Sequence, residues 1–147
     1  MNYNYFMSEA LKLAKISFDE NEVPVGAVIV KNNKIIGKGR NRREQLKNAL
    51  SHAEIEAIND ACKNLRSWRL DGCDMYVTLE PCPMCAGAII NARINKVIYG
   101  AKDESMGAVR SNISMFDLDF NFRPKVVSSV LEEECSRILS DFFKSLR

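Results

Sequence analysis

The sequence predicts an α/β fold, a three-layer α/β/α sandwich around a central mixed five-stranded sheet. Three observations predict it: an amphipathic helix opens the chain, a two-stranded hairpin follows, and helices then alternate with strands to the end of the 147 residues. Such alternation favours one sheet with helices on both faces. We find neither an internal repeat nor an interdomain linker in the sequence, so we expect a single domain over residues 1–147.

The elements of the first half follow from hydrophobic spacing. The first helix has an apolar stripe formed by Met7, Leu11, Ala14 and Phe18. The continuous apolar run VGAVIV at 25–30 predicts a buried strand. KIIGKG at 34–39 predicts its hairpin partner, because Asn32 and Asn33 tolerate the positive φ of a two-residue turn. Residues 52–65, HAEIEAINDACKNL, predict the second helix.

Strands and helices continue to alternate in the second half. MYVTL at 75–79, KVIYGA at 96–101 and KVVSSV at 125–130 predict strands, and PMCAGAIINAR at 83–93 predicts a helix. Residues 103–124 show no clear period and predict a loop with a short helical turn. The last helix carries an apolar face made of Leu131, Cys135, Ile138, Leu139, Phe142 and Leu146.

Composition and the N-terminal sequence indicate the cellular compartment in which we expect the protein. Apolar residues make up 46% and charged residues 27% of the chain, which are ordinary values for a soluble globular protein. No apolar run reaches the roughly 18 residues of a membrane span, and the N-terminus lacks an apolar signal core. We therefore expect a cytoplasmic protein with no membrane association and with its five cysteines reduced.

Basic residues are concentrated in one stretch although the net charge is only +2. Residues 31–47 hold seven of the 21 lysines and arginines and one acid, Glu44. A solvated hairpin and loop would explain this stretch, and so would a patch that contacts phosphates.

Three residues are candidate metal ligands: His52, the only histidine, together with Cys82 and Cys85. A redox disulfide, a structural zinc clip and a catalytic metal site could each use the cysteine pair. Pro83 favours a helix start between the cysteines, where the helix dipole and a metal both favour thiolate. One His and two Cys leave a fourth position open, which is typical of catalytic zinc rather than of a closed structural site.

Glu54 stands two residues after His52. Residues two apart do not share a helix face, so the two side chains converge only if His52 lies at or before the first turn. Ser51 is a candidate N-cap for such a helix. The carboxylate could simply favour the helix start, but beside a metal-activated water it would shuttle protons.

These motifs resemble a known family. H-x-E at 52–54 followed by P-C-x-x-C at 81–85 is the signature of zinc deaminases. The sequence beyond these two motifs resembles the bacterial tRNA-specific adenosine deaminases of the cytidine deaminase-like superfamily. The similarity includes EVPVGAV at 22–28, YGAKD at 99–103 and SDFFKSLR at 140–147. The resemblance implies zinc-dependent hydrolytic deamination of adenosine to inosine at the wobble position of a tRNA anticodon stem-loop, by a homodimer with one Zn²⁺ per chain.

The resemblance also implies roles for individual residues. It implies that His52, Cys82 and Cys85 bind zinc and that Glu54 is the catalytic proton carrier. It further implies that Asn41 and the backbone of Ala53 hold the base, and that Asp103 contacts the ribose of a neighbouring nucleotide. Arg42 and Arg43 directly follow Asn41, so we expect them to contact phosphates.

Other functions remain possible at this level. A free-base or nucleoside deaminase acting on guanine, cytosine or cytidine would use the same zinc chemistry. A non-catalytic zinc-stabilised binding module would have no need of the carboxylate of Glu54. A redox protein would cycle Cys82 and Cys85 without a metal. The sequence departs from the family pattern at Asn48-Ala49, Ser111-Asn112 and Phe122, so these positions bear on substrate-loop selectivity. Three further cysteines fit helix or strand cores: Cys62, Cys73 and Cys135.

Overall fold

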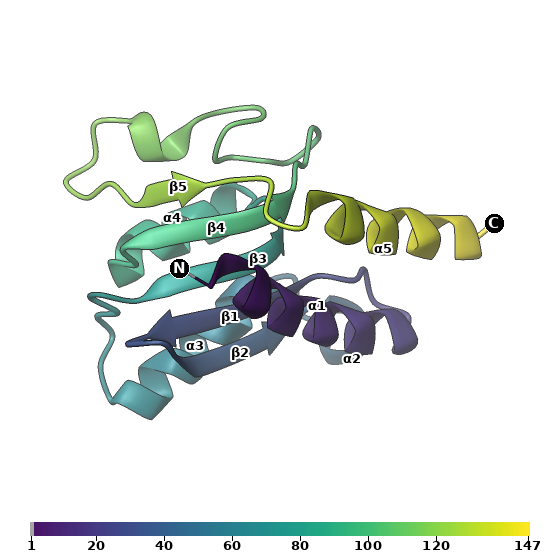
Figure 1. The fold of residues 1–147 in the computed structure, drawn as a ribbon, viewed down its shortest axis with the longest axis horizontal. Helices are drawn as coiled ribbons and strands as arrows, with labels where there is room; N and C mark the ends of the chain where they lie inside the picture. The colour runs from purple at the N-terminus through teal and green to yellow at the C-terminus, as the bar shows by residue number, and fades with distance from the viewer. Residues whose placement is uncertain (1) are drawn as a thin grey trace.

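One mixed five-stranded sheet forms the centre of the molecule (Figure 1), which the computed structural model describes over residues 2–147. Its strands are β1 (Gly26–Lys31), β2 (Lys34–Arg40), β3 (Asp74–Leu79), β4 (Lys96–Ala101) and β5 (Lys125–Val127). The strand order is β2-β1-β3-β4-β5. β1 is antiparallel to both of its neighbours, whereas β3, β4 and β5 are parallel to one another. The mixed sheet is therefore confirmed.

Helices cover both faces of this sheet. α1 (Tyr3–Asp19) and α5 (Glu132–Ser145) pack on one face, and α3 (Ala53–Leu65) and α4 (Pro83–Ala92) pack on the other (Figure 1). The predicted three-layer α/β/α sandwich is confirmed. None of the helices within residues 2–147 is long and apolar enough to cross a bilayer.

β1 separates two hydrophobic cores because its side chains alternate between the two faces of the sheet. Ala27 and Ile29 belong to the core beneath α3 and α4, and Val28 and Val30 belong to the core beneath α1 and α5. A strand buried on both faces needs an apolar residue at nearly every position, and this explains the continuous run that the sequence shows.

Two glycines of β2 let α3 lie unusually close to the sheet. A Cβ at Gly37 would meet the backbone carbonyl of Ala57, and a Cβ at Gly39 would meet the carbonyl of Ala53. The facing stripe of α3 is made of small residues: Ala53, Ala57 and Ala61, all fully buried. This close packing fixes the N-terminal end of α3, where the predicted site residues begin.

The structure differs from the sequence prediction at the ends of some elements. A single helical turn, α2 (Arg43–Leu46), lies in the basic stretch where no helix was expected. β5 ends at Val127 instead of continuing to residue 130, because Ser129 and Leu131 adopt left-handed φ of 64° and 52° that a strand cannot continue through. The predicted helical turn in the 103–124 loop is confirmed as a 3₁₀ turn, Met115–Asp117.

We expect Gly39→Ala to destabilise the fold by about 1–3 kcal/mol, as overpacking of a filled interior does. The added methyl group would lie 2.5 Å from the amide nitrogen of Ala57 and would push α3 off the sheet. Urea unfolding measures the change. Gly87→Ala is the matched control: apart from its own stretch of helix backbone, nothing lies within 4 Å of its added Cβ, and a helical Gly-to-Ala change stabilises by about 0.5–1 kcal/mol. Equal stability of the wild type and Gly39→Ala would contradict the packing account.

Candidate metal centre and substrate pocket

The three predicted ligand residues meet where two helices begin. His52 is the N-cap residue of α3 and Cys82 is the N-cap residue of α4, both with extended backbone, and Cys85 lies in the first turn of α4. The N-cap predicted at Ser51 is wrong by one residue. Because His52 stands just before the helix, its side chain can reach the side of α3 on which Glu54 lies.

The donor atoms are spaced as one metal ion would need them. Within residues 2–147, His52, Cys82 and Cys85 form the one group of three or more potential ligands, and their ligand atoms all lie within 4.8 Å of one another. Nδ1 of His52 lies 3.7 Å from Sγ of Cys82 and 3.6 Å from Sγ of Cys85. A tetrahedral ion with metal–sulfur bonds of about 2.3 Å and metal–nitrogen bonds of about 2.0 Å separates N and S by about 3.5 Å. The donors therefore fit a bound transition-metal ion.

The pKa shifts of the three donor side chains also favour metal binding. Hydrogen bonds from the Cys85 thiol and from His52 lower the pKa of Cys82 to about 4, so Cys82 is a thiolate near neutral pH. The pKa of Cys85 is raised, first because its proton bonds to Cys82 and second because it is buried. The pKa of His52 is raised chiefly by its hydrogen bond to Cys82. A divalent cation held by the three donor atoms would replace the protons on Cys85 and on the coordinating nitrogen of His52.

Glu54 lies in the first turn of α3 with its side chain enclosed. It is 4% exposed, and burial is the main reason that its pKa rises to about 7. The Cys82 thiolate raises this pKa further, whereas the His52 ring and a hydrogen bond with Cys85 lower it. A carboxyl group that titrates near neutral pH can both accept and return a proton during a reaction.

A cavity of about 230 Å³ opens above the ligand residues. Four of the predicted substrate-binding residues line it: Asn41, Arg43, Ala53 and Asp103. The cavity also contains the predicted metal ligands His52 and Cys82, the buried Glu54, and walls formed by Val23, Val25, Leu79, Glu80 and Met106. This volume is below the roughly 300–1,000 Å³ of pockets for drug-sized ligands, so it suits a single nucleobase.

The polar side chains of this pocket also hold its loops. Asn41 donates from Nδ2 to the carbonyl of Val23 and accepts the backbone N–H of Arg43 on Oδ1. A carboxamide has further donor and acceptor capacity, which remains for a ligand. Oδ1 of Asp103 accepts the N–H groups of Ser105 and Met106 and the Ser105 hydroxyl. Both residues are thus fixed before any ligand arrives.

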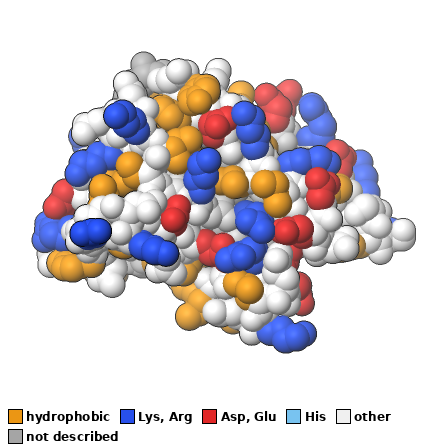
Figure 2. All heavy atoms as spheres, turned by 90° about the horizontal axis from the view of Figure 1, so that it is seen from below, with side chains coloured by type: hydrophobic (Ala, Val, Ile, Leu, Met, Phe, Trp, Pro, Cys, Tyr) orange, Lys and Arg blue, Asp and Glu red, His pale blue; other side chains and the backbone are white. Residues whose placement is uncertain are grey.

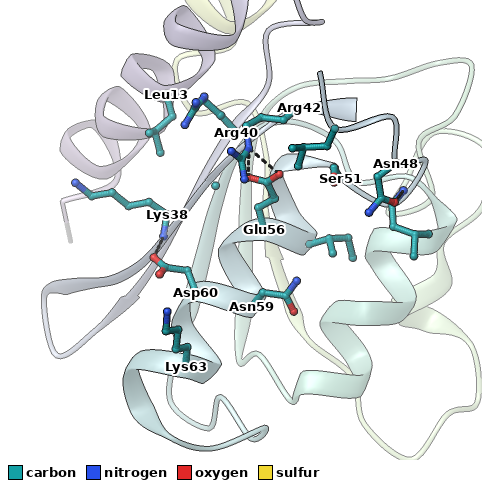
Figure 3. A pocket seen from close by; sticks show the side chains of 14 residues that line it. Leu13, Lys38, Arg40, Arg42, Asn48, Ser51, Glu56, Asn59, Asp60 and Lys63 are labelled. Atoms are coloured by element: carbon teal, nitrogen blue, oxygen red, sulfur yellow. Dashed lines mark hydrogen bonds and ion pairs between the residues drawn. The ribbon is translucent and has the colours of Figure 1, made fainter. Parts of the chain in front are cut away.

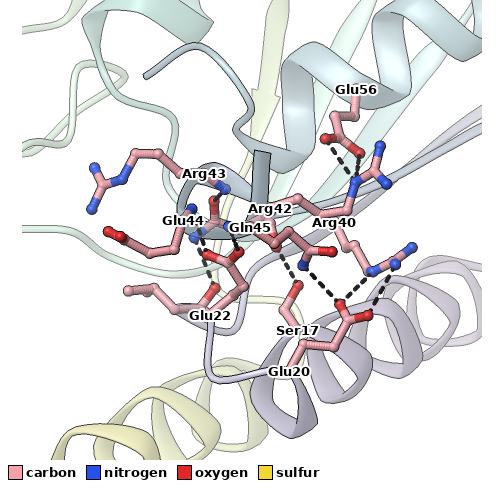
Figure 4. A network of polar contacts seen from close by, with 11 residues as sticks. Ser17, Glu20, Glu22, Arg40, Arg42, Arg43, Glu44, Gln45 and Glu56 are labelled. Atoms are coloured by element: carbon pink, nitrogen blue, oxygen red, sulfur yellow. Dashed lines mark hydrogen bonds and ion pairs between the residues drawn. The ribbon is translucent and has the colours of Figure 1, made fainter. Parts of the chain in front are cut away.

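Arg42 and Arg43 occupy different environments. The Nε of Arg42 lies 3.0 Å from both carboxylate oxygens of Glu56 (Figure 4). Arg42 lines a larger hollow of about 710 Å³ beside α3 and β2, which includes Lys38, Asp60 and none of the ligand residues (Figure 3). Arg43 lines the cavity of about 230 Å³ and its side chain is exposed.

The basic stretch does not form one uninterrupted patch. Arg40 is paired with Glu20 and Arg42 with Glu56, so two of its cations are already neutralised (Figure 4). Figure 2 shows Lys and Arg side chains interspersed with acidic ones on the face seen from below. Among the arginines of this stretch, Arg43 is therefore the one best placed to meet a ligand of the pocket.

Two buried carboxylates that sequence reasoning missed hold the rim of the pocket. Glu22 accepts the backbone N–H groups of Glu44 and Gln45 at the start of α2 (Figure 4). Glu80, which follows β3, accepts backbone N–H groups from the 103–111 segment. Acids in loops usually face solvent, so no sequence signal indicated that Glu22 is buried. For Glu80 the one signal is its position directly before Pro81-Cys82.

Phe122 lies away from the pocket. Its ring lies 5.7 Å from the guanidinium of Arg93, which ends α4. The predicted ligand Cys82 stands at the other end of this ten-residue helix, about 15 Å away at 1.5 Å per residue. The expectation that Phe122 bears on selectivity therefore gains no support from its position.

The remaining cysteines match the packing role expected of them. Cys73 and Cys135 are buried, Cys62 is half-buried, and all three are free thiols.

The chain is similar to known deaminases over its whole length. The family model described as "MafB19-like deaminase" matches residues 1–147. A tRNA-specific adenosine deaminase of Bacillus subtilis (strain 168) is 48% identical over 143 residues, covering 97% of this chain and 89% of the relative. One of Rickettsia bellii is 50% identical over 144 residues, covering 96% and 99%. A solved structure from a study of A-to-I editing by tRNA:A34 deaminases at the wobble position of transfer RNA is 43% identical, with a TM-score of 0.89, covering 92% and 99%.

We expect Cys82→Ser to lose most bound metal, because the hydroxyl of serine is a far poorer ligand than a thiolate. Elemental analysis of protein purified without added metal gives the content per chain. Cys62→Ser, which alters a free thiol in the last turn of α3, should keep the wild-type content. Metal-free wild-type protein with a Cys82–Cys85 disulfide would refute the assignment.

Proposed function

This chain belongs to the MafB19-like deaminase family, and we infer that it deaminates adenosine to inosine in tRNA, at the wobble position of the anticodon. One observation carries the inference: an enclosed carboxyl group with a pKa near 7 lies beside three converging metal donors, at the base of a pocket sized for one nucleobase. A structural metal site needs no such carboxyl group.

We propose zinc as the metal. Two thiolates and one imidazole suit Zn²⁺, and three protein ligands leave one tetrahedral position for water. When bound, the ion supplies a water molecule whose pKa is lowered toward neutrality. His52, Cys82 and Cys85 would hold the ion.

The residues of the chain would then move the protons. Glu54 takes one proton from the water that attacks C6 of adenine and returns it to N1 of the ring. Glu54 next takes the proton of the new C6 hydroxyl group and transfers it to the amino group, which leaves as ammonia while the C6 oxygen becomes the carbonyl of inosine. Burial of Glu54 excludes bulk water, so the proton stays within the pocket.

The pocket geometry favours an adenosine held in a loop. A base enters so small a cavity only after it leaves the helical stack, and loops of RNA offer such bases at low cost. Asn41 and the backbone of Ala53 would contact the base, and Asp103 would contact the neighbouring ribose, since all three line the opening. Arg43 would contact a phosphate outside it.

We further propose a cytoplasmic homodimer. Free thiols throughout the described chain and a thiolate metal site suit a reducing compartment. Leu46 at the end of α2 and Leu50 in the segment between α2 and α3 expose apolar side chains, and a second copy would cover them. The family resemblance supports the same assembly.

Glu54→Gln should retain the metal and the fold and lower kcat by about 100- to 10,000-fold or more, because general acid–base groups contribute on that scale and this one acts in several steps. Single-turnover assays on an anticodon stem-loop measure the rate. Glu56→Gln, in the same helix but paired with Arg42 outside the pocket, should retain most activity. Loss of metal in Glu54→Gln would instead make Glu54 a ligand.

Arg43→Gln should weaken stem-loop binding and flatten its salt dependence by about 0.7 in the log–log slope, the value for one single-strand phosphate contact. Fluorescence anisotropy across a salt series measures both quantities. Arg66→Gln, at the C-terminal end of α3, removes the same charge far from the pocket and should leave the slope unchanged. An unaltered slope in Arg43→Gln would exclude a phosphate contact by Arg43.

A further inference from the structure

We propose that Glu80 is a positioning residue that sets the substrate wall of the pocket, the 103–111 segment, relative to the metal ligand Cys82. The proposal rests on the proposed function, because it concerns how that site receives its RNA. Glu80 is not a metal ligand in this arrangement, and no role was assigned to it by the sequence motifs.

The contacts of Glu80 are unusually many for one side chain. It is 2% exposed. Its Oε1 accepts the N–H of Asp103 at 3.1 Å and the hydroxyl of Ser111. Its Oε2 accepts the N–H groups of Val109, Arg110 and Ser111 at 3.2, 2.8 and 2.9 Å. Five donors thus converge on one carboxylate, and four of them belong to the backbone of the 103–111 segment.

The same residue is joined to the metal-binding side of the pocket. Glu80 directly follows β3 and stands two residues before Cys82. The backbone N–H of Glu80 donates a hydrogen bond to the carbonyl of Ala101. The carbonyl of Pro81 accepts the N–H of Ala108. The strand end that carries Cys82 and the loop that carries Asp103 are therefore fastened together through Glu80 and Pro81.

Close approach of the loop depends on one glycine. A Cβ at Gly107 would lie 2.5 Å from the carboxyl carbon of Glu80 and would also strike the carbonyl of Asp103. The loop thus encloses the carboxylate with no room for a side chain. Asp103 and Met106, which line the pocket, stand before this glycine in the same turn.

The contacts also exclude a direct chemical role for Glu80. An ionised carboxylate offers about four lone-pair directions, and the five donors fill them. No acceptor position remains for a substrate proton, in contrast to Glu54. Glu80 would act only through the loop. Glutamine would turn an N–H₂ group toward backbone N–H donors, so it cannot replace the carboxylate.

The test compares wild type, Glu80→Gln and Glu80→Asp on an anticodon stem-loop that carries adenosine at the wobble position. We expect Glu80→Gln to lower kcat/KM by about 10- to 100-fold, the scale for a displaced substrate contact, chiefly through KM. Metal content should stay at the wild-type value. Hydrogen–deuterium exchange should be faster at the amides of residues 103–111. Glu80→Asp, which keeps the charged acceptor, should recover part of the lost affinity.

Controls separate positioning from other roles. Glu133→Gln removes one exposed carboxylate from α5 and should leave KM and exchange unchanged. A fall in kcat alone would overturn the proposal, and so would unchanged hydrogen exchange of the loop together with an unchanged KM. Loss of metal together with the loss of activity would also overturn it.

If Glu80→Gln fails to fold, Ser111→Ala provides a second test, because it removes a single donor and should raise KM by a few fold. An unchanged KM in Ser111→Ala would then count against the proposal. An inactive wild type would refute the proposed function, while loop exchange would still decide the role of Glu80.

Discussion

The site depends on one constraint: α3 and α4 must begin at the same point above the sheet. Each helix contributes an N-cap residue to the donor set, His52 and Cys82. Convergence requires α3 to approach β2 closely, and the two glycines of that strand permit it. The positive ends of both helices favour the thiolates that a metal needs. A displacement of about 1 Å in either helix would separate the donors beyond what a single ion can bridge.

The number of hydrogen-bond donors explains why two buried acids that line the same pocket do different things. Glu54 has few charge partners and a desolvated carboxyl group, so its pKa rises to about 7 and it can carry protons. Glu80 is as deeply enclosed, but five donors surround its carboxylate, so it holds a loop. Glu22 holds the opposite rim through two backbone N–H groups of α2. The pocket is thus bounded by loops that buried carboxylates fix before an RNA arrives.

The sequence predicted the grouping of His52 with Cys82 and Cys85, which are 30 and 33 residues away, because the chain has a single histidine and the motifs resemble a known signature. It predicted the fold because hydrophobic periodicity is a local signal. The hairpin turn is confirmed for the same reason: Asn32 and Asn33 have φ of 51° and 64°. Long-range contacts leave no such signal. Nothing in the chain near Arg42 showed that Glu56, a turn into α3, would neutralise it. Nor did the sequence around Glu80 indicate that the backbone of a segment more than twenty residues later would hydrogen-bond to its carboxylate.

The most direct test of the account is a substrate comparison on one purified preparation. Anticodon stem-loops with adenosine at the wobble position, the same stem-loops with adenosine elsewhere in the loop, and free adenosine, guanine, cytosine and cytidine are incubated in water enriched in oxygen-18. Inosine is then measured by mass spectrometry and ammonia by a coupled assay. The account predicts inosine with one oxygen-18 at C6, matched by ammonia, from the wobble adenosine and little product from the free compounds. Rapid turnover of free guanine or cytosine, with no inosine in any RNA loop, would contradict it.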